Sequence, residues 1–282
     1  MSAWEWKYVN AGGMNTRYVD IGTGDIVLLL HSADAGSSGT LEYRHNIEPL
    51  SKRFRVIAPD LMGYGGTALP GSKIVKTSQV YIDHILAFTE ALGIERAHFV
   101  GNSRGGLISI AIADVRPQLV NRIILLANAG GAVSKEYMDH QIAMYKDFRP
   151  TPKDVKFFLS GSYFDVERDV PPAVLDEYVA NAVVQYAGYD RIGGLPVDVP
   201  DLRPQLAKTT HAVLFVFGKQ DQRWPPSHDA LEVFLNTPKS RFYMVSDCGH
   251  HPQTEAPNDF NPLAVGFLSG ELDGRLRNAR DR

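Results

Sequence analysis

A serine between two glycines is the strongest chemical signal in this sequence. Residues 100–106 read Val-Gly-Asn-Ser-Arg-Gly-Gly, a G-x-S-x-G pattern that follows an apolar run and precedes a helix-like segment of small residues. The glycines permit a tight turn that holds the serine in strained backbone angles. The hydroxyl of Ser103 would then stand at a helix N-terminus, where the dipole favours developing negative charge. The alternative is an ordinary serine in a glycine-rich turn, but the position between strand and helix favours a nucleophile.

A serine hydroxyl also needs a base that accepts its proton. His250 follows the apolar run 241–245, and Asp221 follows the run 212–217. Both residues therefore lie at the C-terminal ends of expected strands, which is the edge of a parallel sheet where Ser103 lies and where sites form. The order Ser, Asp, His is also the order of a catalytic triad built around such a turn. We predict Ser103 as nucleophile, His250 as base and Asp221 as the acid that orients the base.

Two neighbouring residues compete for these roles. His251 adjoins His250, but a glycine directly before the base is the usual arrangement, and Gly249 precedes His250. Asp247 is nearer to the histidine in the chain than Asp221 is. However, a residue three places away on one loop is badly placed to orient the far ring nitrogen. We therefore prefer His250 as the base and Asp221 as the acid.

Two backbone N–H groups are expected to stabilise the oxyanion that forms when a serine attacks a carbonyl carbon. One belongs to Arg104, directly after the nucleophile, and the other to Ala33, in the loop that follows the apolar run 26–30. Loss of one such donor typically costs about 2.7–4 kcal/mol of transition-state stabilisation. Because both donors are backbone groups, a substitution cannot remove either of them cleanly.

The elements that must position these residues are visible as short apolar runs separated by helix-like segments. Helical periodicity predicts helices over 78–92 and 107–115, and Gly93 marks the end of the first. The apolar runs have the unbroken character of strands buried on both faces. They cover residues 26–30, 55–58, 97–100, 122–126, 212–217 and 241–245. This alternation predicts an α/β fold with a mostly parallel central sheet and helices on both faces.

Residues 132–208 interrupt this pattern. They contain no run typical of a buried strand, and Thr151-Pro152 and Pro171-Pro172 are typical of helix starts. Because the strand pattern resumes at residue 212, we expect 132–208 to form a helical cap. It would be inserted into one α/β core made of residues 1–131 and 209–282. The alternative is a separate C-terminal domain that begins at this point.

Composition and charge argue against several classes of function. The 282 residues are 44% hydrophobic and 22% charged, and the net charge of -3 provides no basic field for nucleic acid or anionic lipid. A single cysteine, Cys248, cannot form an internal disulfide, and the adjacent histidines 250 and 251 are a poor metal clamp. No signal-peptide pattern or membrane-spanning run is visible. We expect a cytoplasmic protein that acts on a small molecule without metal or cofactor, and both monomer and homodimer remain open.

Several short segments point to a known family. They are Tyr-Val-Asn-Ala-Gly-Gly (8–13), Thr-Arg-Tyr (16–18), the His31 loop with Tyr-Arg-His-Asn-Ile (43–47), Gly-Asn-Ser with Gly-Gly (101–106), and Cys-Gly-His (248–250). With these residues the chain resembles the α/β-hydrolase superfamily over nearly its whole length. Within that superfamily it is similar to the meta-cleavage product hydrolases, which cut a carbon–carbon bond in ring-opened aromatic compounds. The resemblance implies the α/β-hydrolase fold, the triad named above, and a substrate contact from Asn102 beside the nucleophile.

The residues around the expected site depart from that family. Members usually have glycines where Ser32 and Ala33 stand, and an asparagine that helps bind the dienoate where Glu42 stands. Arg104 replaces a small or apolar residue, and His251 replaces an aromatic one. The cap arginine that binds the substrate carboxylate has no counterpart near residues 177–185. The expected substrate-binding residues are His31, Ser32, Glu42, Asn102, Arg104 and His251.

Three functions follow from these observations. We prefer hydrolysis of a carbon–carbon bond in a ring-cleavage-type dienoate or diketone. A carboxylesterase or lactonase would use the same triad on an ester, and a ligand-binding protein on the same scaffold would not need the triad at all. One hypothesis concerns Arg104, whose guanidinium suits bidentate binding of a substrate carboxylate. The alternative is that Arg104 points away and pairs with a surface acid.

Overall fold

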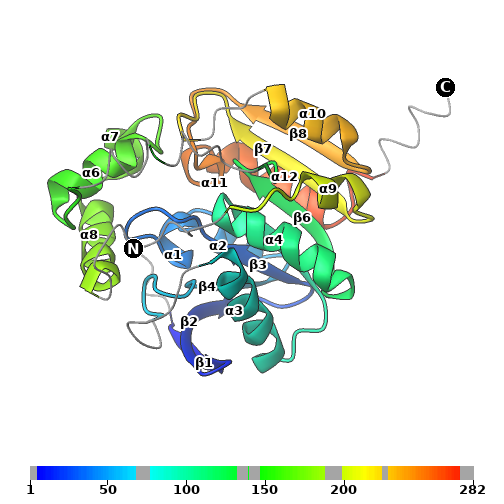
Figure 1. Ribbon diagram of the computed structural model, residues 1–282, viewed down its shortest axis with the longest axis horizontal. Coiled ribbons are helices and arrows are strands. Elements are labelled where there is room, and N and C mark those ends of the chain that lie inside the picture. Colours follow the sequence, from blue (N-terminus) through cyan, green and yellow to red (C-terminus); the bar gives the residue numbers. More distant parts are fainter. Residues whose placement is uncertain are drawn as a thin grey trace.

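The central element of the protein is a sheet of eight strands, in the order β1-β2-β4-β3-β5-β6-β7-β8. The computed structural model describes residues 5–67, 77–131, 139, 147–187, 199–223 and 228–273. Strand β2 pairs antiparallel with β1 and β4, and all other neighbours are parallel, which confirms the predicted mostly parallel sheet (Figure 1). The strands are β1 (Lys7–Ala11), β2 (Met14–Ile21), β3 (Ile26–Leu30), β4 (Arg55–Pro59), β5 (Ala97–Asn102), β6 (Val120–Leu126), β7 (Ala212–Gly218) and β8 (Ser240–Val245).

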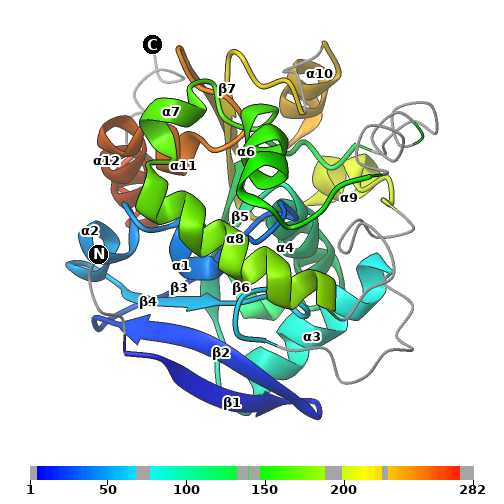
Figure 2. The same cartoon turned by 90° about the vertical axis from the view of Figure 1, so that its left-hand side faces the viewer.

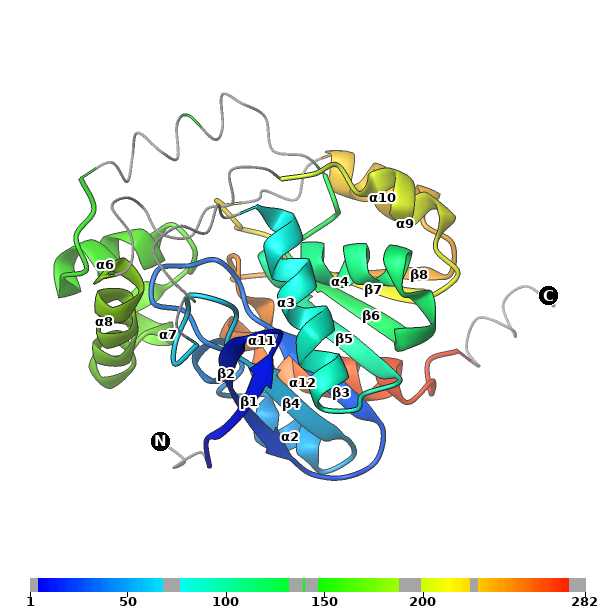
Figure 3. The same cartoon turned by 60° about the horizontal axis from the view of Figure 1, so that its bottom comes forward.

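Helices cover both faces of this sheet because the central strands are apolar on both sides. In β3, Leu28 and Leu30 enter one apolar core, whereas Val27 and Leu29 enter the other. The first core is closed by α3, α4, α9 and α10, and the second by α2 and α12 (Figure 3). The helices flanking the sheet are α1 (Gly39–Glu42), α2 (Ile47–Ser51), α3 (Ser78–Ala91), α4 (Arg104–Val115), η1 (Pro117–Leu119), α9 (Arg203–Lys208), α10 (His228–Asn236), α11 (Pro252–Glu255) and α12 (Pro257–Leu268).

All six strands predicted from the sequence are present, with ends shifted by at most two residues. The first two strands of the sheet were not predicted. Strand β1 lies at the edge of the sheet, and its residues alternate between partly buried and exposed. Polar residues therefore occur throughout β1 and β2, and neither has the unbroken apolar run that marks a strand buried on both faces.

Ahead of α9, the described residues between β6 and β7 form the helices α6 (Pro152–Ser160), α7 (Val166–Asp169) and α8 (Pro172–Ala187). Helices α6 and α8 begin at the predicted prolines. Figures 1 and 3 show these helices grouped at one side of the sheet. Helix α8 packs on α1 in a small apolar cluster of its own (Figure 2). Residues 132–138, 140–146 and 188–198 of the predicted cap lie outside the described residues, so its boundaries stay a prediction.

The turn from β5 to α4 is so tight that it has no space for side chains at its glycines. A Cβ on Gly101 would lie 2.2 Å from the carbonyl carbon of Gly105, and a Cβ on Gly105 would lie 2.0 Å from the Leu30 carbonyl oxygen. Between them Ser103 adopts φ 50° and ψ -108°, a region that residues with a Cβ rarely enter. The predicted G-x-S-x-G turn is therefore a strained junction packed directly against the end of β3.

This packing makes Gly105 sensitive to the smallest substitution. We expect Gly105→Ala to lower the free energy of unfolding by about 1–3 kcal/mol or more, because its methyl group overlaps the backbone of β3. Gly266→Ala is the matched control, since Gly266 also lies in a helix but its Cβ would meet Leu272 at an ordinary 3.5 Å. That variant should be neutral or more stable by about 0.5–1 kcal/mol. Urea unfolding of the two variants measures both effects, and equal stabilities would contradict the packing argument.

Candidate active site

The loops that leave the C-terminal ends of β3, β5, β7 and β8 carry the predicted catalytic residues. His250, after β8, and Asp221, after β7, are both buried, and Nδ1 of His250 lies 2.7 Å from Oδ2 of Asp221. The other carboxylate oxygen of Asp221 accepts the backbone N–H of Arg223 at 2.8 Å. With Nδ1 donating to Asp221, the ring keeps Nε2 as the nitrogen that can accept a proton. The structure thus brings the predicted base His250 and the predicted acid Asp221 within hydrogen-bond distance.

Asn102 connects the turn that carries Ser103 to the loop that carries this base. Its side-chain amide donates to the Leu126 carbonyl at 3.2 Å and to the His250 carbonyl at 2.9 Å. The Ser103 carbonyl accepts from the Asn128 side chain at 2.8 Å. Asn102 was predicted to contact substrate. In the structure its amide nitrogen holds the β5–α4 turn, called the elbow below, in a fixed position relative to the loop of His250 after β8.

His31 fixes the loop that contains Ala33. Its Nδ1 lies 2.8 Å from the Ser32 carbonyl, and its Nε2 accepts the Leu61 N–H at 2.9 Å. Burial lowers the pKa of His31 to about 3, so the ring is neutral with its proton on Nδ1. Because both ring nitrogens bond to backbone groups, His31 links the loop after β3 to the loop after β4.

Glu42 accepts hydrogen bonds from polar groups in the loop that follows β3. Its carboxylate accepts the Ser32 N–H at 2.8 Å and the Ser32 hydroxyl at 2.5 Å, and it also accepts the Ser37 hydroxyl. Burial raises the pKa of Glu42, and the nearby charge of Asp34 adds to that effect. Glu42 and Ser32, both predicted to bind substrate, are therefore bonded to each other and shape the loop around Ala33.

The two predicted oxyanion donors belong to neighbouring strand ends. Strands β3 and β5 are adjacent, and Leu30 pairs with Gly101, so the loop of Ala33 and the elbow of Arg104 leave the sheet side by side. The Ala33 carbonyl accepts the Tyr64 hydroxyl at 3.2 Å. The sheet order therefore brings the two predicted donors to the same edge of the sheet.

The Arg104 side chain is buried rather than at the surface. Its Nη1 donates to the Tyr64 hydroxyl at 2.7 Å, and its guanidinium lies 4.6 Å from the ring centroid of Tyr81. Both contacts are favourable for a cation, because a hydroxyl oxygen accepts from it and the face of an aromatic ring attracts it. The residue that directly follows Ser103 therefore carries a buried guanidinium.

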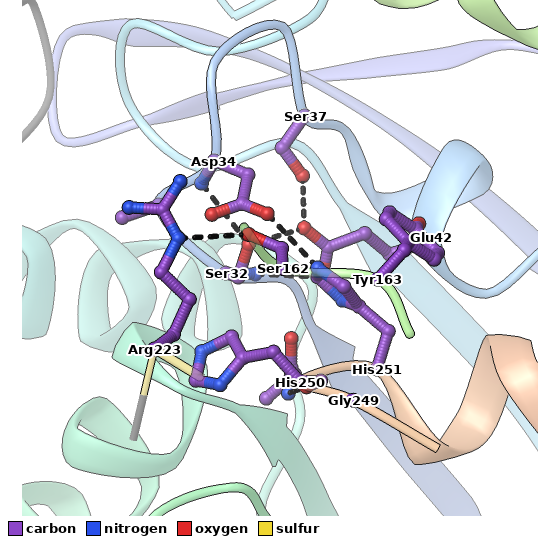
Figure 4. Close-up of polar contacts among 12 residues, drawn as sticks. Ser32, Asp34, Ser37, Glu42, Ser162, Tyr163, Arg223, Gly249, His250 and His251 are labelled. Atoms are coloured by element: carbon purple, nitrogen blue, oxygen red, sulfur yellow. Dashed lines mark hydrogen bonds and ion pairs between the residues drawn. The ribbon is translucent and has the colours of Figure 1, made fainter. Parts of the chain in front are cut away.

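His251 is buried between the loop that follows β8, called the base loop below because it carries the predicted base His250, and the loop that follows β3. Its Nε2 lies 2.9 Å from Oδ2 of Asp34, and its ring stacks on Tyr163 with centroids 4.6 Å apart (Figure 4). Its Nδ1 is 4.0 Å from Oε2 of Glu42. Burial opposes both charges, but the hydrogen bond between them prevails: the pKa of His251 is raised and that of Asp34 is lowered. His251 and Asp34 form a buried ion pair.

Several residues of this region were missed by sequence reasoning. Asp34 directly follows the predicted donor Ala33, and an acid at that position is a signal that could have been noticed. Ser162 and Tyr163 follow α6 and had no signal, because their contacts with Arg223 and His251 depend on how the inserted helices fold back.

Two further features concern the described residue ranges taken together. Within them, no three His, Cys, Asp or Glu side chains are grouped so that they could hold a metal ion. Among the same residues, no helix has the length and apolar character needed to cross a membrane.

The ion pair gives the stability of the protein a defined pH dependence. The pKa of His251 is raised above 6.5 in the folded protein. Its contribution to the free energy of unfolding is therefore complete below pH 6.5 and is lost as the pH rises through the pKa of the folded state. The pKa of Asp34 is lowered below 3.8, so the contribution of Asp34 to the free energy of unfolding is complete above pH 3.8 and is lost in stronger acid. His251→Gln should therefore cost about 3–5 kcal/mol near pH 6 and less near pH 9, measured by urea unfolding.

A second buried histidine provides the control for that measurement. Burial lowers the pKa of His98 to about 4. The contribution of the neutral His98 ring to the free energy of unfolding is therefore complete above pH 6.5 and is lost as the pH falls towards 4. The cost of His98→Gln should therefore grow with pH, opposite to that of His251→Gln. Parallel trends in the two variants would contradict a charged His251.

Comparison with known proteins places this geometry in a family. A family model described as the alpha/beta hydrolase fold matches residues 25–170. The chain is 31% identical over 278 residues to a 2-hydroxy-6-oxo-6-(2'-aminophenyl)hexa-2,4-dienoic acid hydrolase of Metapseudomonas resinovorans, which covers 96% of this chain and 93% of that protein.

Two solved structures agree with this relationship. A serine hydrolase involved in carbazole degradation aligns with a TM-score of 0.78 and 27% identity, over 95% of this chain and 99% of that one. The meta-cleavage product hydrolase of Pseudomonas fluorescens IP01 aligns with a TM-score of 0.74 and 27% identity, over 94% and 98%. The chain belongs to the α/β-hydrolase fold family, in which it is a hydrolase similar to the meta-cleavage product hydrolases.

Proposed function

We propose that the protein is a serine hydrolase that cleaves a carbon–carbon bond in a ring-cleavage-type dienoate or diketone. In this proposal Ser103 is the nucleophile, His250 the general base and Asp221 the orienting acid. The observation that carries it is the strained Ser103 at the same sheet edge as the buried His250–Asp221 pair, whose atoms lie 2.7 Å apart. The relatives named as dienoate hydrolases support the substrate class.

The geometry supports a two-stage reaction at a carbonyl carbon. Nε2 of His250 takes the proton of Ser103 as the serine oxygen adds to the carbonyl, and Asp221 stabilises the imidazolium. The N–H groups of Ala33 and Arg104 stabilise the oxyanion. His250 then returns the proton to the leaving group, and water hydrolyses the acyl-enzyme. A carbon leaving group must keep the electron pair, so such a substrate must react in a keto form whose neighbouring carbonyl delocalises that charge.

Two parts of the chain are proposed to select the substrate. The guanidinium of Arg104, buried next to the nucleophile, would bind a substrate carboxylate. Residues 132–208 would form a cap over the strand ends. Helix α8 supports that role, since the side chains of Asn181 and Gln185 bond to the backbone of Gly36 in the loop after β3.

A carboxylesterase or lactonase is the second candidate. One observation favours it: Asp34 is paired with His251, but the Glu42 carboxylate beside Ala33 accepts its hydrogen bonds from neutral groups, so an ionised Glu42 would repel a dianionic substrate. A neutral ester or lactone would not meet that repulsion. The triad and the oxyanion donors would be the same.

A fluorophosphonate probe tests the nucleophile without knowledge of the substrate. We expect stoichiometric labelling of Ser103 in the wild type and none in Ser103→Ala, read by intact-protein and peptide mass spectrometry. Asp221→Asn should keep the fold and lower kcat by about 10⁴-fold, because the ring loses its orienting acceptor. A folded wild type that takes up no probe would instead identify a ligand-binding protein on this scaffold.

Side-by-side assays distinguish the two substrate classes and test Arg104. We expect a higher kcat/KM for a coloured dienoate than for a short-chain nitrophenyl ester. Arg104→Gln should raise KM for the dienoate by about 10- to 100-fold, the worth of a charge-assisted hydrogen bond, and leave KM for the neutral ester unchanged. A preference for the ester would favour the second candidate. Equal effects on both substrates would show that Arg104 does not bind the carboxylate.

A further inference from the structure

His251 links the two loops on which the proposed reaction depends. It directly follows His250 in the chain, and the two rings are perpendicular with centroids 5.6 Å apart. Its own ring nitrogen bonds to Asp34, in the loop after β3, 217 positions away in sequence. Asp34 in turn directly follows Ala33, and its backbone N–H donates to the Ser32 hydroxyl at 3.1 Å. One side chain therefore ties the base loop to the proposed oxyanion loop.

The charge of Asp34 is a difficulty for the proposed reaction. An oxyanion at the Ala33 N–H would form one residue away from this carboxylate, in a buried site where like charges repel strongly. Burial works against ionisation of Asp34, but the hydrogen bond and charge of His251 outweigh it and lower the pKa of the carboxyl. Asp34 is thus ionised, and a free carboxylate there would oppose the very charge that the loop has to stabilise.

The cation that offsets Asp34 is held in place from several sides. Tyr163 stacks on the His251 ring, and the backbone N–H of His251 donates to Glu255 at 2.9 Å. Glu255 also accepts the N–H groups of Gly249 and Phe164, which fixes the turn before the catalytic base. The ring is therefore positioned by contacts that do not depend on Asp34.

Other charged groups also surround the pair. The guanidinium of Arg223 acts on Asp34 through space, while its Nε donates to Ser162 at 3.0 Å (Figure 4). Glu42 lies 4.0 Å from the second ring nitrogen, and its carboxylate is bonded to Ser32 and Ser37. His250 also acts on Asp34, but it is the base and changes its charge during turnover. His251 is the cation for which a hydrogen bond to Asp34 is observed.

We propose that His251 is a positioning residue that neutralises Asp34, so that the oxyanion forms beside a neutral ion pair instead of a free carboxylate. This inference rests on the proposed function. It assigns His251 a role in the charge balance of the transition state, with no contact to the reacting atoms. The adjacent histidines then have separate duties: His250 moves the proton, and His251 holds the oxyanion loop neutral and in place.

The rate of fluorophosphonate inactivation reports on this role. In that reaction the Ser103 oxygen–phosphorus bond forms, the P–F bond breaks, His250 takes the serine proton, and fluoride leaves. The phosphoryl oxygen occupies the oxyanion hole. We expect His251→Gln, which removes the charge, to slow inactivation by about 10-fold or more, as for a disturbed oxyanion hole. With an ester substrate, kcat should fall while KM stays the same.

The double variant Asp34→Asn/His251→Gln separates charge from packing. It removes the carboxylate together with the cation, so we expect its inactivation rate to return to within about threefold of the wild type. A purely structural role for His251 predicts that a second buried substitution makes the defect worse. His98→Gln is the matched control, because His98 is buried at the opposite end of β5 from the elbow. Its inactivation rate should equal that of the wild type.

Each outcome bears on one claim. Absence of labelling in the wild type overturns the proposed function itself. Labelling of the wild type with an unchanged rate in His251→Gln overturns only this inference. So does a double variant as slow as His251→Gln, because the defect would then not come from charge. Should His251→Gln fail to fold, the double variant decides: a rate within about threefold of the wild type supports the proposal, and a loss of about 10-fold overturns it.

Discussion

The close contact between the β5–α4 turn and the end of β3 is the constraint on which the site depends. Backbone atoms of Leu30, Gly101 and Gly105 meet where any side chain would overlap them. This contact forces Ser103 into a positive φ and sets the elbow beside the loop that follows β3. The strain in the turn is balanced by two apolar cores that hold β3 and β5 from both faces. The proposed nucleophile Ser103 and the loop of the proposed oxyanion donor Ala33 take their relative positions from this junction.

The polar residues at the C-terminal ends of the strands form a second layer that is joined by hydrogen bonds. Asp221 orients His250, Asp34 pairs with His251, and Glu42 accepts hydrogen bonds from two serines. Buried acids of this number would be costly if each lacked a partner. The bonds Asp221–His250 and Asp34–His251 run between loops, whereas those of the Glu42 carboxylate stay within the segment that follows β3. This layer therefore fixes the geometry of the loops as well as their electrostatics.

Local patterns in the sequence were sufficient for much of this arrangement. The six apolar runs, the elbow glycines and the order of Ser103, Asp221 and His250 follow from short segments, and the structure has the strands and the His250–Asp221 pair that they predict. The polar edge strands β1 and β2 lack such a pattern and were missed.

Contacts between distant loops were beyond the same reasoning. His251, Glu42 and Ser32 were noticed only as departures from a related family. Their connection through Asp34 depends on loops that meet because of the sheet order, which no single segment encodes. The structural role of His31 could not be predicted from the sequence either, because its partner Leu61 belongs to the loop after β4.

The bonds from α8 to Gly36 have a consequence for chimeric enzymes. Asn181 and Gln185 hold the backbone of the loop that also contains Ala33, and a Cβ on Gly36 would collide with the Tyr178 carbonyl. A segment exchange that removed both amide side chains would release the backbone of the loop that contains Ala33. A graft designed to alter the proposed cap should therefore keep Asn181 and Gln185, so that this loop stays in place while other residues of the inserted helices change.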